Sequence, residues 1–192
     1  MSKLVLASAS PRRKEILQNF NVPFSIIPAN VEEIIRDGEG PKEIAMALAL
    51  EKALYVMEQA DQNDIIVAAD TIVYKNEIYG KPSSYEDAFR MLSSLQNDIH
   101  IVFSGIAVIQ KSTNIKIVDF ESTKVKIKKM DENRIRKYIE TGEVWDKAGA
   151  YAIQGKGSLF IEWIKGDYFN VVGLPIAKLD NILRTYFHLE ML

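Results

Sequence analysis

The chain has 192 residues, of which 47% are hydrophobic and 26% are charged, and its formal net charge is −2. These ordinary values exclude a disordered chain, a collagen-like repeat and a membrane-spanning protein, and without repeats or linkers they predict one domain over residues 1–192. The lack of a basic excess argues against a stable complex with nucleic acid. Because the chain has no cysteine, any metal must be bound by oxygen atoms or by the two histidines.

The first predicted elements are a strand and a helix joined by a short turn. Residues 4–7 predict a buried strand, and Ser10-Pro11 then begins a helix, because proline is favoured at the first helical position. The opening lacks the long apolar core of a secretory signal, so we expect a cytoplasmic protein. Residues 24–28 predict a second short strand.

A longer helix and a central strand follow. Gly40-Pro41 opens the helix, whose expected inward stripe consists of Ala47, Leu50, Leu54 and Met57. Residues 65–73 are apolar on both faces and therefore predict a strand in the centre of a sheet. Asp70 and Thr71 interrupt this apolar run.

The second half of the chain mixes strands and helices. Asn76-Glu77 predicts a hairpin turn, Ser84 predicts a helix cap, and Asp131 predicts another. Further strands are expected at residues 100–109, 115–127 and 159–164, and a last helix from Pro175. This order requires at least two antiparallel pairings, so we expect an α/β protein with a mixed β-sheet and flanking helices.

The turn Ser8-Ala9-Ser10-Pro11-Arg12-Arg13 carries two hydroxyls and two guanidinium groups where a strand meets a helix N-terminus. Backbone N–H groups and the helix dipole favour an anion at such a position, and arginine matches phosphate oxygens. The alternative is that Ser10 caps the helix and that the arginines are ordinary surface charges. Both interpretations remain open on residue types alone.

Three charged residues and one amide are further candidates. A buried carboxylate at Asp70 needs a partner, which can be a salt bridge, a strand-end cap or a functional ligand. Lys52 is more simply part of a solvated helix face, and Lys81 lies in a Gly-Lys-Pro loop that can also bind phosphate. Gln154, in the Gly-rich stretch 149–157, has an amide suited to a nucleobase edge, or else it is exposed on a mobile connection.

Taken together, these segments resemble the Maf family of nucleotide pyrophosphatases over nearly the whole chain. The matching segments occur in family order and are Leu6-Ala7-Ser8-Ala9-Ser10-Pro11-Arg12-Arg13, Glu33, Glu51-Lys52, Ala69-Asp70-Thr71, Gly80-Lys81-Pro82, Asp146-Lys147-Ala148-Gly149-Ala150-Tyr151, Ile153-Gln154-Gly155 and Val172-Gly173-Leu174-Pro175. The resemblance implies an elongated, two-lobed mixed sheet with flanking helices and a central cleft, similar to the inosine triphosphate pyrophosphatases. It also implies a homodimer, because family members are often dimers.

The resemblance further implies a substrate class. Arg12, Thr71 and Gln154 are similar to the branch that acts on dTTP and UTP, whereas a branch acting on 7-methyl-GTP has an aromatic residue, Gln and Glu there. The implied reaction gives the monophosphate and pyrophosphate, serves to clean nucleotide pools, which include modified pyrimidine nucleotides, and is linked to arrest of cell division. Gly80 replaces an acidic residue of some members of this branch, so the loop of Lys81 is a weak basis for specificity.

The expected site follows from this class of reaction. Asp70 is the expected general base, Glu33 and Asp70 are expected to hold Mg²⁺ or Mn²⁺, and Arg13, Lys52 and Lys81 are expected to stabilise phosphate charge. The expected substrate-binding residues are Ser8, Ser10, Arg12, Thr71 and Gln154.

Two other hypotheses compete with this one. The chain could be a non-catalytic nucleotide-binding regulator of septum formation, or it could transfer a nucleotidyl group to an acceptor. Glu33 and Asp70 favour an enzyme, because a simple binder of a polyanion gains nothing from acidic residues near phosphates unless a metal joins them.

Overall fold

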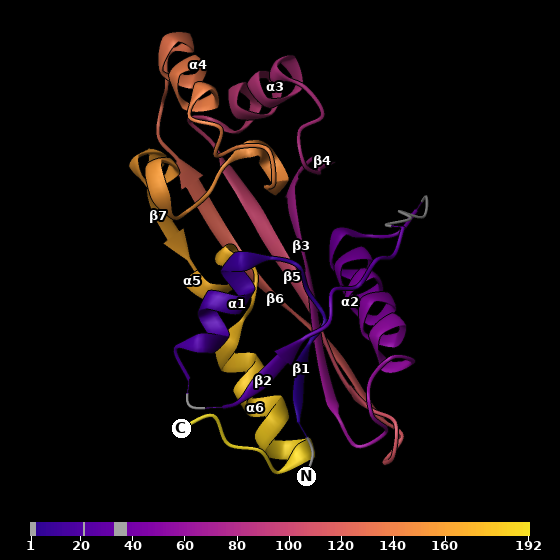
Figure 1. The fold of residues 1–192 in the computed structure, drawn as a ribbon. Coiled ribbons are helices and arrows are strands. Elements are labelled where there is room, and N and C mark those ends of the chain that lie inside the picture. Colours follow the sequence, from indigo (N-terminus) through magenta and orange to yellow (C-terminus); the bar gives the residue numbers. More distant parts are fainter. Residues whose placement is uncertain (1–2, 21, 33–37) are drawn as a thin grey trace. The chain divides into compact units, whose positions relative to one another are not determined.

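The computed structural model describes residues 3–20, 22–32 and 38–192. It contains a seven-stranded mixed sheet in the order β2-β1-β3-β5-β6-β7, with β4 paired to β3 (Figure 1). The strands are β1 (Leu4–Leu6), β2 (Phe24–Ile26), β3 (Ile65–Lys75), β4 (Glu77–Tyr79), β5 (Ile99–Gln110), β6 (Ile115–Ile127) and β7 (Ile161–Lys165). The helices are α1 (Pro11–Gln18), α2 (Pro41–Met57), α3 (Tyr85–Leu95), α4 (Glu132–Glu140), α5 (Tyr168–Val172) and α6 (Ile176–Phe187). The expected α/β class with a mixed sheet is confirmed.

The chain folds as two compact units. The first unit consists of Met1–Asp70, Ser104–Glu121 and Gly173–Leu192, and the second consists of Thr71–Phe103 and Ser122–Val172. Strands β3, β5 and β6 contribute residues to both units. The expectation of a single domain over residues 1–192 stays a prediction. Within the described ranges, no helix is long and apolar enough to cross a membrane.

The first unit is built on parallel strands. β1 pairs in parallel with β2 on one side and with β3 on the other. Because strand residues alternate between faces, Val5 and Ile66 point to the same side of the sheet, where they pack with Ala49 and Val56 of α2. Figure 1 shows α2 on one side of these strands and α1 and α6 on the other.

The buried stripe of α2 differs from the predicted stripe. Its buried residues are Ile44, Ala45, Leu48, Ala49, Ala53 and Val56, whereas the predicted residues Ala47, Leu50, Leu54 and Met57 are only partly buried. Gly105 of β5 explains the close approach of this face, because a Cβ at that position would lie 2.1 Å from the carbonyl oxygen of Ala45. The helix therefore approaches the sheet most closely at Ala45, and Leu50 and Leu54 lie beside the buried stripe.

The second unit contains the two predicted helix caps and a hairpin. Asn76 has φ 60° between the antiparallel strands β3 and β4, as the predicted turn requires. The Ser84 hydroxyl accepts from the Asp87 N–H at 3.1 Å, and the Asp131 carboxylate accepts from the Arg134 N–H at 2.8 Å. Both predicted caps are therefore confirmed.

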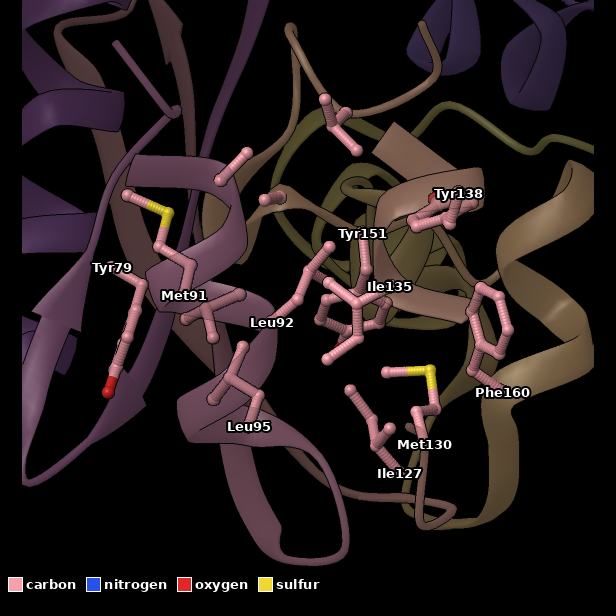
Figure 2. Close-up of a cluster of buried hydrophobic side chains, with 14 of the residues drawn as sticks. Tyr79, Met91, Leu92, Leu95, Ile127, Met130, Ile135, Tyr138, Tyr151 and Phe160 are labelled. Atoms are coloured by element: carbon pink, nitrogen blue, oxygen red, sulfur yellow. The ribbon is translucent and has the colours of Figure 1, made fainter. Parts of the chain in front are cut away.

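Side chains from α3, α4 and their neighbouring segments form the core of the second unit (Figure 2). The predicted strand at residues 159–164 begins later, at Ile161, because Gly155–Phe160 forms a 3-10 helix, η2. A shorter 3-10 helix, η1 (Ala148–Ala150), precedes it, and α5 is a further helix that the sequence pattern did not indicate.

Candidate active site

The strand-to-helix turn after β1 is held by the hydroxyl of Ser8. This residue is buried, with 7% of its surface exposed. Its Oγ accepts a hydrogen bond from the Ser10 backbone N–H at 3.1 Å and another from Nη1 of Arg13 at 3.3 Å. Ser10 occupies the N-cap position of α1, but its side chain makes no capping hydrogen bond. Ser10 is therefore the N-cap residue of α1, as the alternative interpretation predicts, with Pro11 as the first helical residue.

Arg13 is fixed at both edges of its guanidinium group. Besides its bond to Ser8, it donates from Nε to the carbonyl oxygen of Gly173 at 2.7 Å. The Ser8 oxygen already accepts two hydrogen bonds, so the hydrogen of the Ser8 hydroxyl can be donated to a ligand. A hydroxyl donor, a guanidinium group and the N-terminus of α1 together form a site that suits an anion.

Asp70 is buried and forms an ion pair with the partly buried Lys52. Lys52 Nζ lies 2.5 Å from Asp70 Oδ1, and the two side chains are 12% and 10% exposed. Asp70 follows Ile66 and Ala68 on the face that packs against α2, because strand residues alternate. Lys52 continues the buried stripe of α2, since it follows Leu48 by four residues and precedes Val56 by four. The interpretation of Lys52 as a solvated residue is therefore wrong, and the salt bridge considered for Asp70 is observed.

The Ser8 turn and Asp70 lie at the same edge of the first unit. The parallel register pairs Leu6 with Val67, and the Ala7 N–H continues the pairing with a 2.8 Å bond to the Val67 carbonyl oxygen. Continued by two residues, this register places Ser8 beside Ala69, which precedes Asp70. Ligands of α/β sheets bind beyond the carboxyl ends of parallel strands, so this edge has the expected position for a site.

The second unit holds the remaining predicted residues. Thr71 follows Asp70 directly in β3 and is partly buried. Lys81 is exposed in its loop, and the carbonyl oxygen of the neighbouring Gly80 accepts from the Gly149 N–H at 3.0 Å. This bond joins the Lys81 loop to the Gly-rich segment that leads to Gln154. Gln154 is partly buried rather than exposed.

The residues of the predicted site are divided between the two units. The first group, Ser8, Ser10, Arg12, Arg13, Lys52 and Asp70, belongs to the first unit, and the second group, Thr71, Lys81 and Gln154, belongs to the second. That the two groups share one cleft stays a prediction. Glu33 lies outside the described residues.

A divalent metal fits this edge through Asp70. Lys52 binds Oδ1, and the other carboxylate oxygen makes no hydrogen bond to the described part of the chain. Residues 3–20, 22–32 and 38–192 contain no group of three His, Cys, Asp or Glu side chains that could hold a metal. Mg²⁺ commonly uses only one or two protein carboxylates and takes its remaining ligands from substrate phosphates and water. Asp70 fits that pattern.

A second buried polar pair lies outside the predicted site. His100 Nε2 and the Tyr151 hydroxyl are 2.6 Å apart in the second unit. Burial, with a smaller contribution from nearby Lys75, lowers the pKa of His100 from 6.5 to about 4. Burial also raises the pKa of Tyr151. Both side chains are neutral near pH 7, so this pair is a structural hydrogen bond.

Glu143 has a role that the sequence analysis missed. Its carboxylate accepts hydrogen bonds from the backbone N–H groups of Lys156 and Gly157, two and three residues after Gln154. The signal in the sequence is weak, because Glu143 lies in a turn after α4, 13 and 14 residues before those groups. An isolated acidic residue in a turn is ordinarily solvated.

These features define a class of protein: a mixed α/β fold with a strand-to-helix turn at the carboxyl end of β1, beside a lysine–carboxylate pair. Residues 3–186 match the model of the Maf-like protein family. The chain belongs to this family.

The curated relatives are similar over most or all of their lengths. The chain is 48% identical over 192 residues to the dTTP/UTP pyrophosphatase of Alkaliphilus metalliredigens, which covers 100% of both chains. It is 52% identical over 186 residues to the dTTP/UTP pyrophosphatase of Caldanaerobacter subterraneus, which covers 96% of this chain and 89% of the relative. The Staphylococcus aureus Ham1 protein is similar with a TM-score of 0.46 and 14% identity, over 66% of this chain and 72% of that one.

Proposed function

We propose that this chain is a nucleoside triphosphate pyrophosphatase that hydrolyses dTTP and UTP to the monophosphate and pyrophosphate. The names and the full-length similarity of its relatives support this substrate class. The observation that carries the proposal is the Lys52–Asp70 pair, placed by strand register beside the Ser8 turn. Positively charged side chains that can bind a polyphosphate, and a carboxylate that can accept a proton from water, are then available at one edge of the first unit.

The phosphate charge is stabilised by groups that are already in place. Arg13 is fixed by Ser8 and Gly173, so little conformational entropy is lost when a phosphate binds. An ammonium group carries three donors, and therefore Lys52 can hold Asp70 and a phosphate oxygen at the same time. Lys81 is the proposed third cation. Preorganised positive groups supply most of the catalysis in phosphoryl transfer.

Asp70 is the proposed general base. Its carboxylate accepts a proton from the attacking water, while Lys52 holds Oδ1. That water attacks the α phosphorus, the bond between this phosphorus and the oxygen leading to the β phosphate breaks, and pyrophosphate leaves. Glu33 and Asp70 would hold Mg²⁺ or Mn²⁺, which supplies neutralisation of phosphate charge and increases the acidity of bound water.

The base of the nucleotide is recognised by Arg12, Thr71 and Gln154 in this proposal. The Gln154 amide pairs with the O4 and N3 edge of uracil or thymine, since it can donate to O4 and accept from the N3 hydrogen. Cytosine reverses both requirements, and the polar groups of the site would then be left unpaired. The proposal further includes a cytoplasmic homodimer that needs neither nucleic acid nor a membrane.

A nucleotide panel tests the proposal. Pyrophosphate release from dTTP, UTP, CTP, GTP and 7-methyl-GTP is measured with purified protein, with and without a chelator. We expect release from dTTP and UTP above that from the other three and its loss with chelator. Equal rates on all five nucleotides would contradict the specificity, and no release from any of them would contradict the enzyme.

The regulator hypothesis makes a different prediction. A non-catalytic binder would retain nucleotide affinity and release no pyrophosphate. No structural feature favours it over hydrolysis, because the Lys52–Asp70 pair places a carboxylate where a simple binder of a polyanion would not need one.

A further inference from the structure

The carboxylate of Glu143 caps the backbone that follows Gln154. Oε1 and Oε2 accept from the Lys156 N–H at 3.2 and 3.0 Å, and Oε2 also accepts from the Gly157 N–H at 3.4 Å. These N–H groups lie in the first turn of η2, where a helix has no internal acceptors for them. A charged acceptor at this position is shared among donors that would otherwise be unsatisfied.

Gly155 makes room for this carboxylate. Its φ is +64°, a conformation that favours glycine. A Cβ at this position would lie 3.0 Å from Oε1 and 3.1 Å from Oε2 of Glu143. The peptide on the C-terminal side of Gln154 is therefore shaped by the carboxylate that it surrounds.

The C-terminal end of α4 also holds the backbone on the N-terminal side of Gln154. Tyr138 of α4 accepts at its hydroxyl from the Ala152 N–H at 3.1 Å, and its ring is buried in the core of the second unit (Figure 2). The Thr141 hydroxyl accepts from the Glu143 N–H at 3.3 Å and donates to the Tyr138 carbonyl oxygen at 2.7 Å. The backbone is therefore held by hydrogen bonds two residues before Gln154, at Ala152, and two residues after it, at Lys156.

We propose that Glu143 is a positioning residue for base selection, which acts by fixing the backbone on which Gln154 is presented. This inference rests on the proposed function, in which Gln154 pairs with O4 and N3 of the pyrimidine. Glutamate suits the position because both of its oxygens accept, whereas glutamine would turn N–H groups toward backbone N–H groups. The carboxylate touches the backbone and not the nucleotide.

The test compares selectivity in Glu143→Gln and Gln154→Ala. The measured quantity is the ratio of kcat/KM for UTP to kcat/KM for CTP. We expect Glu143→Gln to lower this ratio about tenfold, mainly through a higher KM for UTP, because a small displacement of a positioned group is costly. Adding Glu143→Gln to Gln154→Ala should lower the ratio no further, because both changes act through one amide.

A second variant and a control keep the test specific. Gly155→Ala displaces the same carboxylate without removing it and should lower the ratio in the same direction. The matched control is Glu140→Gln, an exposed glutamate at the end of α4, which should leave the ratio unchanged. A purely structural role for Glu143 would instead reduce kcat/KM for both nucleotides equally.

The outcomes also separate this inference from the proposed function. If the wild-type protein releases pyrophosphate preferentially from UTP and both Glu143→Gln and Gly155→Ala keep that preference, the positioning role is wrong while the proposed function stands. If the wild-type protein shows no preference for UTP, the proposed specificity itself fails, and the inference fails with it.

Discussion

Two buried polar pairs distinguish the two units of this protein. In the first unit, Lys52 and Asp70 form an ion pair, and their side chains are 12% and 10% exposed. In the second unit, His100 and Tyr151 form a hydrogen bond at 2.6 Å, and His100 is only 1% exposed. The first pair lies beside the Ser8 turn, just beyond the carboxyl end of β1, whereas the second borders a hydrophobic core.

The comparison shows that burial of a polar group does not by itself identify a functional site. Burial drives His100 and Tyr151 to their neutral forms, and a neutral pair only needs mutual hydrogen bonding. A charged pair costs more free energy to bury, and replacement by apolar residues is often neutral or stabilising. Retention of charge beside the Ser8 turn is therefore better explained by chemistry than by stability.

The largest expected effect is on Asp70. Asp70→Asn removes the proposed general base but keeps an acceptor for Lys52, so the rate of pyrophosphate release should fall about a hundredfold to ten-thousandfold. The change is measured as kcat for UTP, with thermal unfolding to verify the fold. A kcat near the wild-type value would remove Asp70 from the mechanism.

A smaller effect is expected from Gly105→Ala, which disturbs the first pair through packing. The new Cβ would lie 2.1 Å from the carbonyl oxygen of Ala45, so α2 must move away from the sheet and carry Lys52 with it. We expect a loss of about 3 kcal/mol in the free energy of unfolding, at the upper end for overpacking, together with a lower kcat. Gly80→Ala is the control for stability, because a Cβ there meets nothing within 4 Å. Wild-type stability of Gly105→Ala would contradict the close packing.

The His100–Tyr151 pair should contribute to the pH dependence of the free energy of unfolding. The pKa of His100 in the folded protein is about 4, below its ordinary 6.5, so the unfolded chain binds a proton first as the pH falls. The contribution of His100 is complete above about pH 6.5 and is lost as the pH falls through about 4, which amounts to about 2 kcal/mol between pH 7 and pH 5.

His100→Gln should abolish this share of the pH dependence. The exposed His188 provides the matched control, and His188→Asn should retain the dependence. Urea unfolding of the three proteins at pH 7 and pH 5 gives the measurement. An unchanged dependence in His100→Gln would mean that other groups cause it.

The smallest effect is expected at a surface ion pair of the first unit. Lys178 and Asp119 lie 2.9 Å apart, with side chains 23% and 45% exposed. Asp119→Asn is the same chemical change as Asp70→Asn, but at a solvated position it should alter the free energy of unfolding by less than about 1 kcal/mol. The rate of pyrophosphate release should not change, and a large loss of rate would show that the assay does not distinguish buried from exposed carboxylates.

Much of the fold was predictable because local signals were strong. The caps at Ser84 and Asp131 and the hairpin at Asn76 depend on neighbouring residues only, and the apolar run of β3 identified the central strand. The segment Gly155–Phe160 was not predictable in the same way, because the carboxylate that accepts from its first N–H groups is distant in sequence.

The sequence indicates residue types for a candidate site, but it does not indicate their geometry. Lys52 was assigned to a solvated face because the stripe of α2 was placed on Leu50 and Leu54, the larger leucines. The stripe lies elsewhere because Gly105 lets small residues approach the sheet, a tertiary contact that the helix sequence does not contain. Glu143 was missed for the same reason, since its partners are distant in sequence.

The central claim is that the charged pair of the first unit performs chemistry while the neutral pair of the second unit stabilises the fold. The most direct measurement is the rate of pyrophosphate release from UTP per folded molecule, determined side by side for Asp70→Asn and Tyr151→Phe. We expect Asp70→Asn to lose nearly all of the rate, and Tyr151→Phe to keep it while its melting temperature falls. A substantial rate in Asp70→Asn, or a comparable loss of rate in both variants, would contradict the claim.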